Sequence, residues 1–185
     1  TFLTLAFLSS AVFAQTTWKS DPMHSKLTFS TTHLGISDVA GLFKTFEVTI
    51  NGSQANFSDA VFTLTADVGS IDTEVEMRDN HLKSADFFDA AKYPTAKFEI
   101  TGVEPIANDS SATHKISGNL TLKDSTKNVS FPAKVAIADN KVSATASFNI
   151  DRTQWGMFYG NDQSLGDKMI RPEVNIKLNI NANKL

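Results

Sequence analysis

The side chains best suited to polar chemistry gather in one short segment, where Arg78, Asp79 and His81 follow one another closely. Arginine and histidine three residues apart lie on the same face of a helix, so both can donate hydrogen bonds to the polar head of a ligand. The alternative is structural: Arg78 forms an ion pair with neighbouring strands and His81 is solvated. The residue pattern leaves both interpretations open.

His33 is a third polar candidate because it shares a strand face with the apolar residues Leu27 and Phe29. A histidine on such a face either contacts a ligand or is a hydrogen-bonded structural residue at a strand end. The structural interpretation is the more economical one. His33, Arg78 and His81 together form the predicted polar end of a binding site.

The sequence predicts no catalytic residue, no metal site and no cofactor. Carboxylates are frequent between positions 74 and 89, but a catalytic carboxylate needs an environment that perturbs its pKa, and charge on a short helix usually serves solubility. The four histidines are scattered and cysteine is absent, whereas a metal site needs three or four converging ligands. The chain contains no glycine-rich dinucleotide or Walker motif.

Phenylalanine dominates the aromatic residues, with 14 Phe against two Trp and two Tyr. A Phe ring has a large apolar surface and no polar handle, so this excess points toward the interior. We expect an apolar wall of seven aromatic residues: Phe29, Phe43, Phe46, Phe62, Phe98, Phe148 and Trp155. The rings either fill a dry core or, with small neighbours such as Ala66 and Ala146, surround a cavity.

Strands must position these rings, because apolar and polar residues alternate with period two after Gln15. The alternation predicts eight strands, over 27–33, 42–50, 62–68, 98–100, 116–122, 129–137, 142–150 and 174–180. Short turns such as Asn51-Gly52 join them, which indicates antiparallel neighbours. We therefore predict an all-β fold, an eight-stranded antiparallel barrel wide enough to hold one small ligand.

One segment departs from the alternation. Thr73-Glu74-Val75-Glu76 reads as a capping box, and helical spacing follows to about Ser84. The sequence therefore predicts a short helix between the third and fourth strands.

The N-terminal run of residues 1–14 is apolar and ends in Val12-Phe13-Ala14, which is typical of a signal-peptide cleavage site. The alternative is a buried N-terminal strand. We expect a clipped signal peptide over 1–14, a single domain over 15–185, and a periplasmic or secreted protein. A net charge of −3 gives no basic footprint for nucleic acid, and without cysteine no lipidated residue can form a stable membrane anchor. Oligomeric state stays open, a homodimer included.

Several motifs resemble the YceI family, and together they extend over nearly all of residues 15–180. They are Asp21-x-x-His24-Ser25-x-Leu27-x-Phe29, Arg78-Asp79-x-His81-Leu82-x-Ser84-x-Asp86-Phe87-Phe88, Tyr93-Pro94-x-Ala96-x-Phe98 and Phe148-x-Ile150-x-Arg152-x-x-Trp155-Gly156. The central block from Arg78 to Tyr93 is the most specific. In the last motif Trp155 stands where many relatives carry Phe.

The resemblance implies a lipocalin-like periplasmic barrel whose tunnel binds a polyisoprenoid or the tail of an isoprenoid quinone. It implies binding, storage or transport rather than turnover, with the Phe side chains along the tunnel and His33, Arg78 and His81 nearer its polar end. Two alternatives remain: an enzyme that acts on a prenyl diphosphate at the barrel mouth, and a structural or stress protein without a ligand.

Overall fold

The computed structural model describes residues 16–33, 37–52, 60–138, 140–161 and 170–185. These ranges contain one antiparallel sheet, one short α-helix, α1 (Glu76–Lys83), and two 3₁₀ turns, η1 (Val68–Ser70) and η2 (Arg152–Trp155). The strands are β1 (Thr16–Ser20), β2 (Lys26–His33), β3 (Ser37–Phe43), β4 (Phe46–Gly52), β5 (Val61–Asp67), β6 (Ile71–Asp72), β7 (Thr95–Pro105), β8 (His114–Leu122), β9 (Ser125–Ala138), β10 (Lys141–Asp151) and β11 (Glu173–Lys184).

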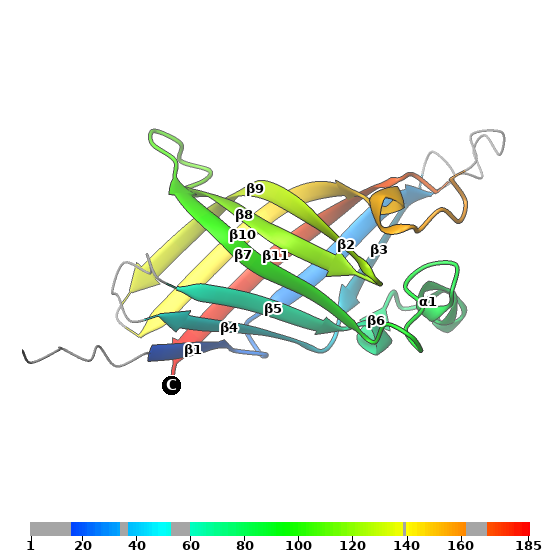
Figure 1. The fold of residues 1–185 in the computed structure, drawn as a ribbon, viewed down its shortest axis with the longest axis horizontal. Coiled ribbons are helices and arrows are strands. Elements are labelled where there is room, and N and C mark those ends of the chain that lie inside the picture. The colour runs from blue at the N-terminus through cyan, green and yellow to red at the C-terminus, as the bar shows by residue number, and fades with distance from the viewer. Residues whose placement is uncertain (1–15, 34–36, 53–59, 139, 162–169) are drawn as a thin grey trace, which may run out of the picture.

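The sheet closes into a barrel. Its pairing order runs β1-β4-β5-β7-β8-β9-β10-β11, and β11 pairs back with β1, which returns the sheet to its first strand. The strands β2, β3 and β6 continue the positions of β1, β4 and β5 toward the end of the barrel where α1 lies (Figure 1). The predicted eight-stranded antiparallel barrel with one short helix is therefore confirmed.

Three details of the prediction were wrong. Asn51-Gly52 does not form a turn, because both residues belong to β4 and pair with β1. The second strand does not run unbroken over 42–50, because Lys44 and Thr45 interrupt it between β3 and β4. The predicted capping box does not form either. Val75 is the N-cap of α1 and makes no side-chain cap, while the Thr73 hydroxyl donates to Asp79 Oδ1 at 2.5 Å. Thr73 thus ties the turn before the helix to its first turn instead of capping it.

The two ends of the barrel differ in how they are filled. At the end formed by β1, β4 and the meeting of β10 with β11, six buried side chains form one cluster, and we call this the packed end. Its members are Trp18, Val48, Ile50, Val142, Ile180 and Ala182. The opposite end carries α1 and η2, and we call it the helical end (Figure 1). Neither α1 nor the 3₁₀ turns have the length and apolarity that a membrane-crossing helix requires.

Candidate functional site

A cavity of about 590 Å³ occupies the barrel interior toward the helical end. This volume falls within the range of about 300–1,000 Å³ that is usual for small-molecule sites. Its most exposed wall residues are Met77 on α1, 83% exposed, and Tyr159 after η2, 49% exposed, so the cavity opens to solvent between these two segments. The deeper wall is apolar and includes Leu27, Phe29, Leu64, Phe98, Leu120, Phe131, Phe148, Ile176 and Leu178.

Two glycines keep the aromatic rings against the wall. A β-carbon built on Gly41 would lie 2.5 Å from Phe29 Cζ, and one built on Gly118 would lie 2.4 Å from Phe98 Cζ. Gly41 is the direct cross-strand partner of Phe29 in the pairing of β2 with β3. Because neither glycine has a side chain, each ring lies down over it instead of standing into the lumen. These two contacts help to leave the interior hollow.

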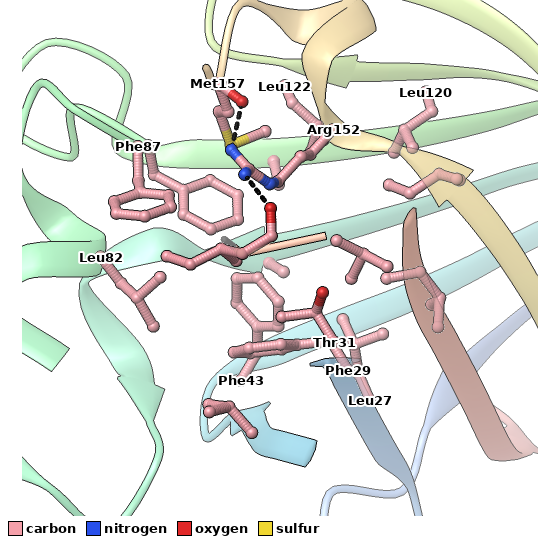
Figure 2. Close-up of a pocket in the computed structure, with 18 of the residues that line it drawn as sticks. Leu27, Phe29, Thr31, Phe43, Leu82, Phe87, Leu120, Leu122, Arg152 and Met157 are labelled. Atoms are coloured by element: carbon pink, nitrogen blue, oxygen red, sulfur yellow. Dashed lines mark hydrogen bonds between the residues drawn. The ribbon is translucent and has the colours of Figure 1, made fainter. Parts of the chain in front are cut away.

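Four of the seven predicted aromatic residues line the cavity, namely Phe29, Phe43, Phe98 and Phe148. Phe148 stacks on the buried ring of Phe131 with centroids 3.9 Å apart and planes within 2°. Phe43 meets Phe29 edge to face at 5.8 Å. Figure 2 shows Phe29 and Phe43 directed toward the same enclosed space as Arg152 and Leu82.

The other three predicted aromatic residues lie elsewhere. Phe46 and Phe62 are half-buried and pack against the cluster at the packed end. Trp155 is buried in the core beside the cavity, and its Nε1 donates to the Leu120 carbonyl at 3.1 Å. An indole buried in this way needs an acceptor, and the end of β8 supplies it. Trp155 therefore anchors η2 to the barrel.

All three predicted polar residues, His33, Arg78 and His81, line the cavity at the helical end. Arg78 donates from Nε to Thr73 Oγ1 at 2.8 Å and from Nη2 to the Thr73 carbonyl at 2.7 Å. His81 Nε2 lies 3.0 Å from Asp86 Oδ2. The structural interpretation was therefore wrong in its partners, because Arg78 bonds to neutral groups of its own segment rather than to an acid on a neighbouring strand, and His81 contacts Asp86. Both side chains also line the cavity.

Sequence reasoning missed Arg152, which is 4% exposed and belongs to the cavity wall. Its guanidinium donates to three backbone carbonyls: Met157, Ile170 at 2.8 Å and Arg171 at 3.2 Å. Figure 2 shows two of these hydrogen bonds, including the one to Met157. Burial removes water from the charge and lowers the pKa of Arg152 below its ordinary value. The signal was present in the sequence, because Arg152 continues the inward face of Phe148 and Ile150.

The second missed group is an aromatic contact across the mouth. His81 meets the Tyr159 ring edge to face at 4.5 Å, and Phe87 lies 5.1 Å from His81 and 5.4 Å from Tyr159. These contacts join α1 and the segment after it to the chain that follows η2. The Phe87-Phe88 pair was visible in the sequence as an apolar connection, but nothing in its pattern placed it beside Tyr159.

Across the described ranges, no group of three or more His, Asp or Glu side chains could hold a metal ion.

Comparison with known proteins gives the family. The sequence profile of the YceI-like domain matches residues 18–182. This chain belongs to the YceI family. Protein YceI of Salmonella agona is 37% identical over 136 residues, which cover 73% of this chain and 69% of that protein. Protein YceI of an Escherichia coli strain is 38% identical with the same coverage.

Solved structures share the barrel of this YceI-family chain. BcnA of Burkholderia cenocepacia superposes with a TM-score of 0.76 at 24% identity, covering 89% of this chain and 99% of BcnA. A polyisoprenoid binding domain from Saccharophagus degradans gives 0.70 at 15% identity, with 91% and 98% covered. The Campylobacter jejuni YceI protein gives 0.65 at 25% identity, with 82% and 88% covered. The first two likenesses establish the fold.

Proposed function

We propose that this YceI-family protein binds and carries an isoprenoid lipid, either a polyisoprenoid or the tail of an isoprenoid quinone. The observation that carries the proposal is the cavity itself: about 590 Å³, with an apolar interior, and open at the helical end. Its depth is lined by aliphatic and Phe side chains from β2, β5 and β7–β11, which suits a branched hydrocarbon chain. The polyisoprenoid binding domain of Saccharophagus degradans, which has the same fold, supports this choice of ligand class.

The energetics suit such a chain. At about 0.8 kcal/mol for each buried CH₂-sized group, one five-carbon isoprene unit offers roughly 3–4 kcal/mol before the cost of ordering. Three or four units would therefore offer on the order of 10–15 kcal/mol, from which association removes at least several kcal/mol. Micromolar binding requires a net of about 8 kcal/mol, so a segment of about four units approaches micromolar affinity when the association cost is near its lower bound of about 4 kcal/mol.

We further propose that the protein acts without turnover and works in the periplasm or outside the cell. Arg78 and His81, the residues that a prenyl diphosphate enzyme would need at the mouth, donate to or contact Thr73 and Asp86. The proposed location rests on the apolar run of residues 1–14, which lies outside the described residues.

The test is a cavity-filling substitution with a matched control. Val129 on β9 belongs to the cavity wall, whereas Val103 on β7 is exposed at the surface. We expect purified protein to release a near-stoichiometric prenyl lipid on organic extraction, and delipidated protein to take up added ubiquinone. Val129→Phe should reduce uptake about tenfold or more because the added ring occupies the site, and Val103→Phe should leave uptake unchanged.

Two results would count against the proposal. A clean extract together with no uptake of quinone would leave the cavity without a ligand of this class. Conversion of a bound prenyl diphosphate into a product, lost in His81→Ala, would favour the enzyme instead.

A further inference from the structure

Arg152 is a buried cation that forms no salt bridge with a carboxylate among the described residues, although the charge of the adjacent Asp151 acts on it. Among the described residues, the lysines that pair with carboxylates, such as Lys19 with Glu47 and Lys97 with Glu99, do so at the surface. Arg152 is buried, and each hydrogen bond that it makes goes to a backbone carbonyl of the described chain. Carbonyl dipoles solvate the guanidinium in part, but they bring no compensating negative charge.

The guanidinium also keeps donor capacity. Nε, Nη1 and Nη2 each use one N–H on a carbonyl, and each Nη carries a second N–H. The side chain belongs to the cavity wall beside Phe87, whose ring centroid lies 5.8 Å from the guanidinium carbon. Joining the backbone at Met157 to the backbone at Ile170 and Arg171 explains three of the donor N–H groups. It does not explain why a charged group, rather than a neutral one, lies at the wall of an apolar cavity.

Polar side chains of the wall gather at this same end. His33, Arg78, His81 and Tyr159 lie around the mouth, and the Thr31 hydroxyl donates to the Glu173 carbonyl at 2.9 Å nearby. Lys97 is an exception, and its ammonium pairs with Glu99 at 2.9 Å. Toward the packed end the wall consists of rings and aliphatic groups such as Phe98, Phe131 and Leu178. A ligand with one polar end therefore has a single favourable orientation.

We propose that the cavity selects amphiphiles with an oxyanion head, a carboxylate or a phosphate, and that Arg152 binds this head while the apolar tail lies toward Phe98 and Phe131. The inference rests on the proposed function, because it assumes that an apolar chain occupies the cavity. A charge-assisted hydrogen bond from a desolvated guanidinium to an oxyanion is stronger than one to an alcohol or a carbonyl. The lowered pKa of Arg152 reflects the same desolvation, which an anionic head offsets.

The experiment compares ligands that share one isoprenoid tail and differ only in the head group. Delipidated full-length protein is titrated with geranylgeraniol, geranylgeranic acid, its methyl ester and geranylgeranyl monophosphate, and affinities are measured by calorimetry. We expect at least one of the two anions to bind about tenfold or more tightly than the alcohol and the ester. The tighter of the two identifies the oxyanion.

Variants assign the effect to Arg152. Arg152→Gln should reduce the preference for the anion to about twofold or less while the alcohol still binds, and Arg152→Lys should keep part of it. Arg171→Gln is the matched control, because Arg171 is exposed and only its backbone carbonyl contacts Arg152. This control should keep the full preference.

Equal binding of all four ligands to the unmodified protein would overturn the oxyanion proposal and leave isoprenoid binding intact. This comparison needs no variant, so it decides the matter even if Arg152→Gln fails to fold. An anion preference that survives in a folded Arg152→Gln variant would overturn the assignment to Arg152. Failure of all four ligands to bind would instead contradict the proposed function itself.

Discussion

The packed end and the helical end of this barrel are built from the same alternation of apolar and polar residues, yet one is solid and the other is hollow. At the packed end, Ile50 is 1% exposed and Trp18 is buried beside it as its direct cross-strand partner. Around the cavity, Phe29 and Phe98 face inward in the same way but remain half-buried beside open space. Alternation therefore decides which side chains point inward, and it does not decide whether they meet.

The size of the neighbouring residue differs between the two regions at these positions. Trp18 faces Ile50, so two large side chains point into the same region and fill it. Phe29 faces Gly41, and the Phe98 ring lies over Gly118, so each of these large side chains has a neighbour with no side chain. At the packed end two large neighbours fill the lumen, and beside the cavity these two rings lie over glycine and leave room for it.

The largest expected effect is a difference in stability loss between an Ile→Ala substitution at the packed end and one on the cavity wall. Ile50→Ala should lower the free energy of unfolding by about 2–5 kcal/mol, because it opens a void in a closely packed cluster. Ile176→Ala, the matched change on the cavity wall, should cost less than about 2 kcal/mol, because this half-buried side chain already faces open space. Denaturant unfolding of the two variants measures the difference. Equal losses would mean that the helical end is packed as tightly as the packed end.

The next effect concerns the glycines. At Gly118 a new β-carbon would also meet the Glu99 carbonyl oxygen at 2.6 Å, so the backbone must shift, and Gly118→Ala should cost about 1–3 kcal/mol of stability. At Gly41 the close atoms are side-chain atoms of Phe29 and Thr73. Gly41→Ala should therefore push the Phe29 ring into the cavity and weaken lipid uptake more than it lowers stability.

A second-site change tests this account of Gly41. Trimming the displaced ring in the double variant Gly41→Ala/Phe29→Leu should restore much of the uptake lost in Gly41→Ala, because Leu needs less room above the new methyl group. Quinone titration of the three proteins gives the comparison. Additive losses in the double variant would show that Gly41 does not shape the lumen through Phe29.

The contrast also explains what could be predicted from the sequence. Eight strands and a helix between the third and fourth were predictable, because alternation and helical spacing are local patterns. The cavity was not, since Phe29 alternates identically in a dry core and in a tunnel, and its cross-strand pairing with Gly41 cannot be read from the alternation. The position of Trp155 was not predictable either, because its indole donates to the carbonyl of Leu120, which is far away in the sequence.

The roles of polar residues were harder still to predict, because they depend on hydrogen-bond partners that the alternation of apolar and polar residues does not reveal. The capping box failed because Thr73 is engaged by Arg78 and Asp79, both several residues further along the chain. Arg152 was missed although it directly follows β10 and continues its inward face, since an arginine directly after a strand is usually exposed. Its carbonyl partners Met157 and Ile170 both come after η2, and no local sequence pattern places them beside Arg152.

The smallest expected effect comes from the surface of the helical end, where Lys44 between β3 and β4 pairs with Asp72 on β6 at 2.5 Å. The hydrogen bond from Lys44 holds the pKa of Asp72 below its ordinary range. A carboxyl whose pKa is lower in the folded than in the unfolded state stabilises the fold above about pH 4, and the contribution is lost as the pH falls through the folded-state pKa.

Lys44→Met removes this partner and keeps most of the aliphatic stem. We expect a small loss of stability at pH 7, reduced further by salt because the pair is exposed, and a difference from the unmodified protein that shrinks below about pH 4. Lys127→Met on β9, which removes an exposed lysine that has no ion pair within the described residues, should show no such pH dependence. Unfolding curves at pH 7 and pH 3 make the measurement. A loss for Lys44→Met that is equal at both values would assign the effect to packing of the stem, and the helical end would then resemble the packed end in depending on apolar contacts alone.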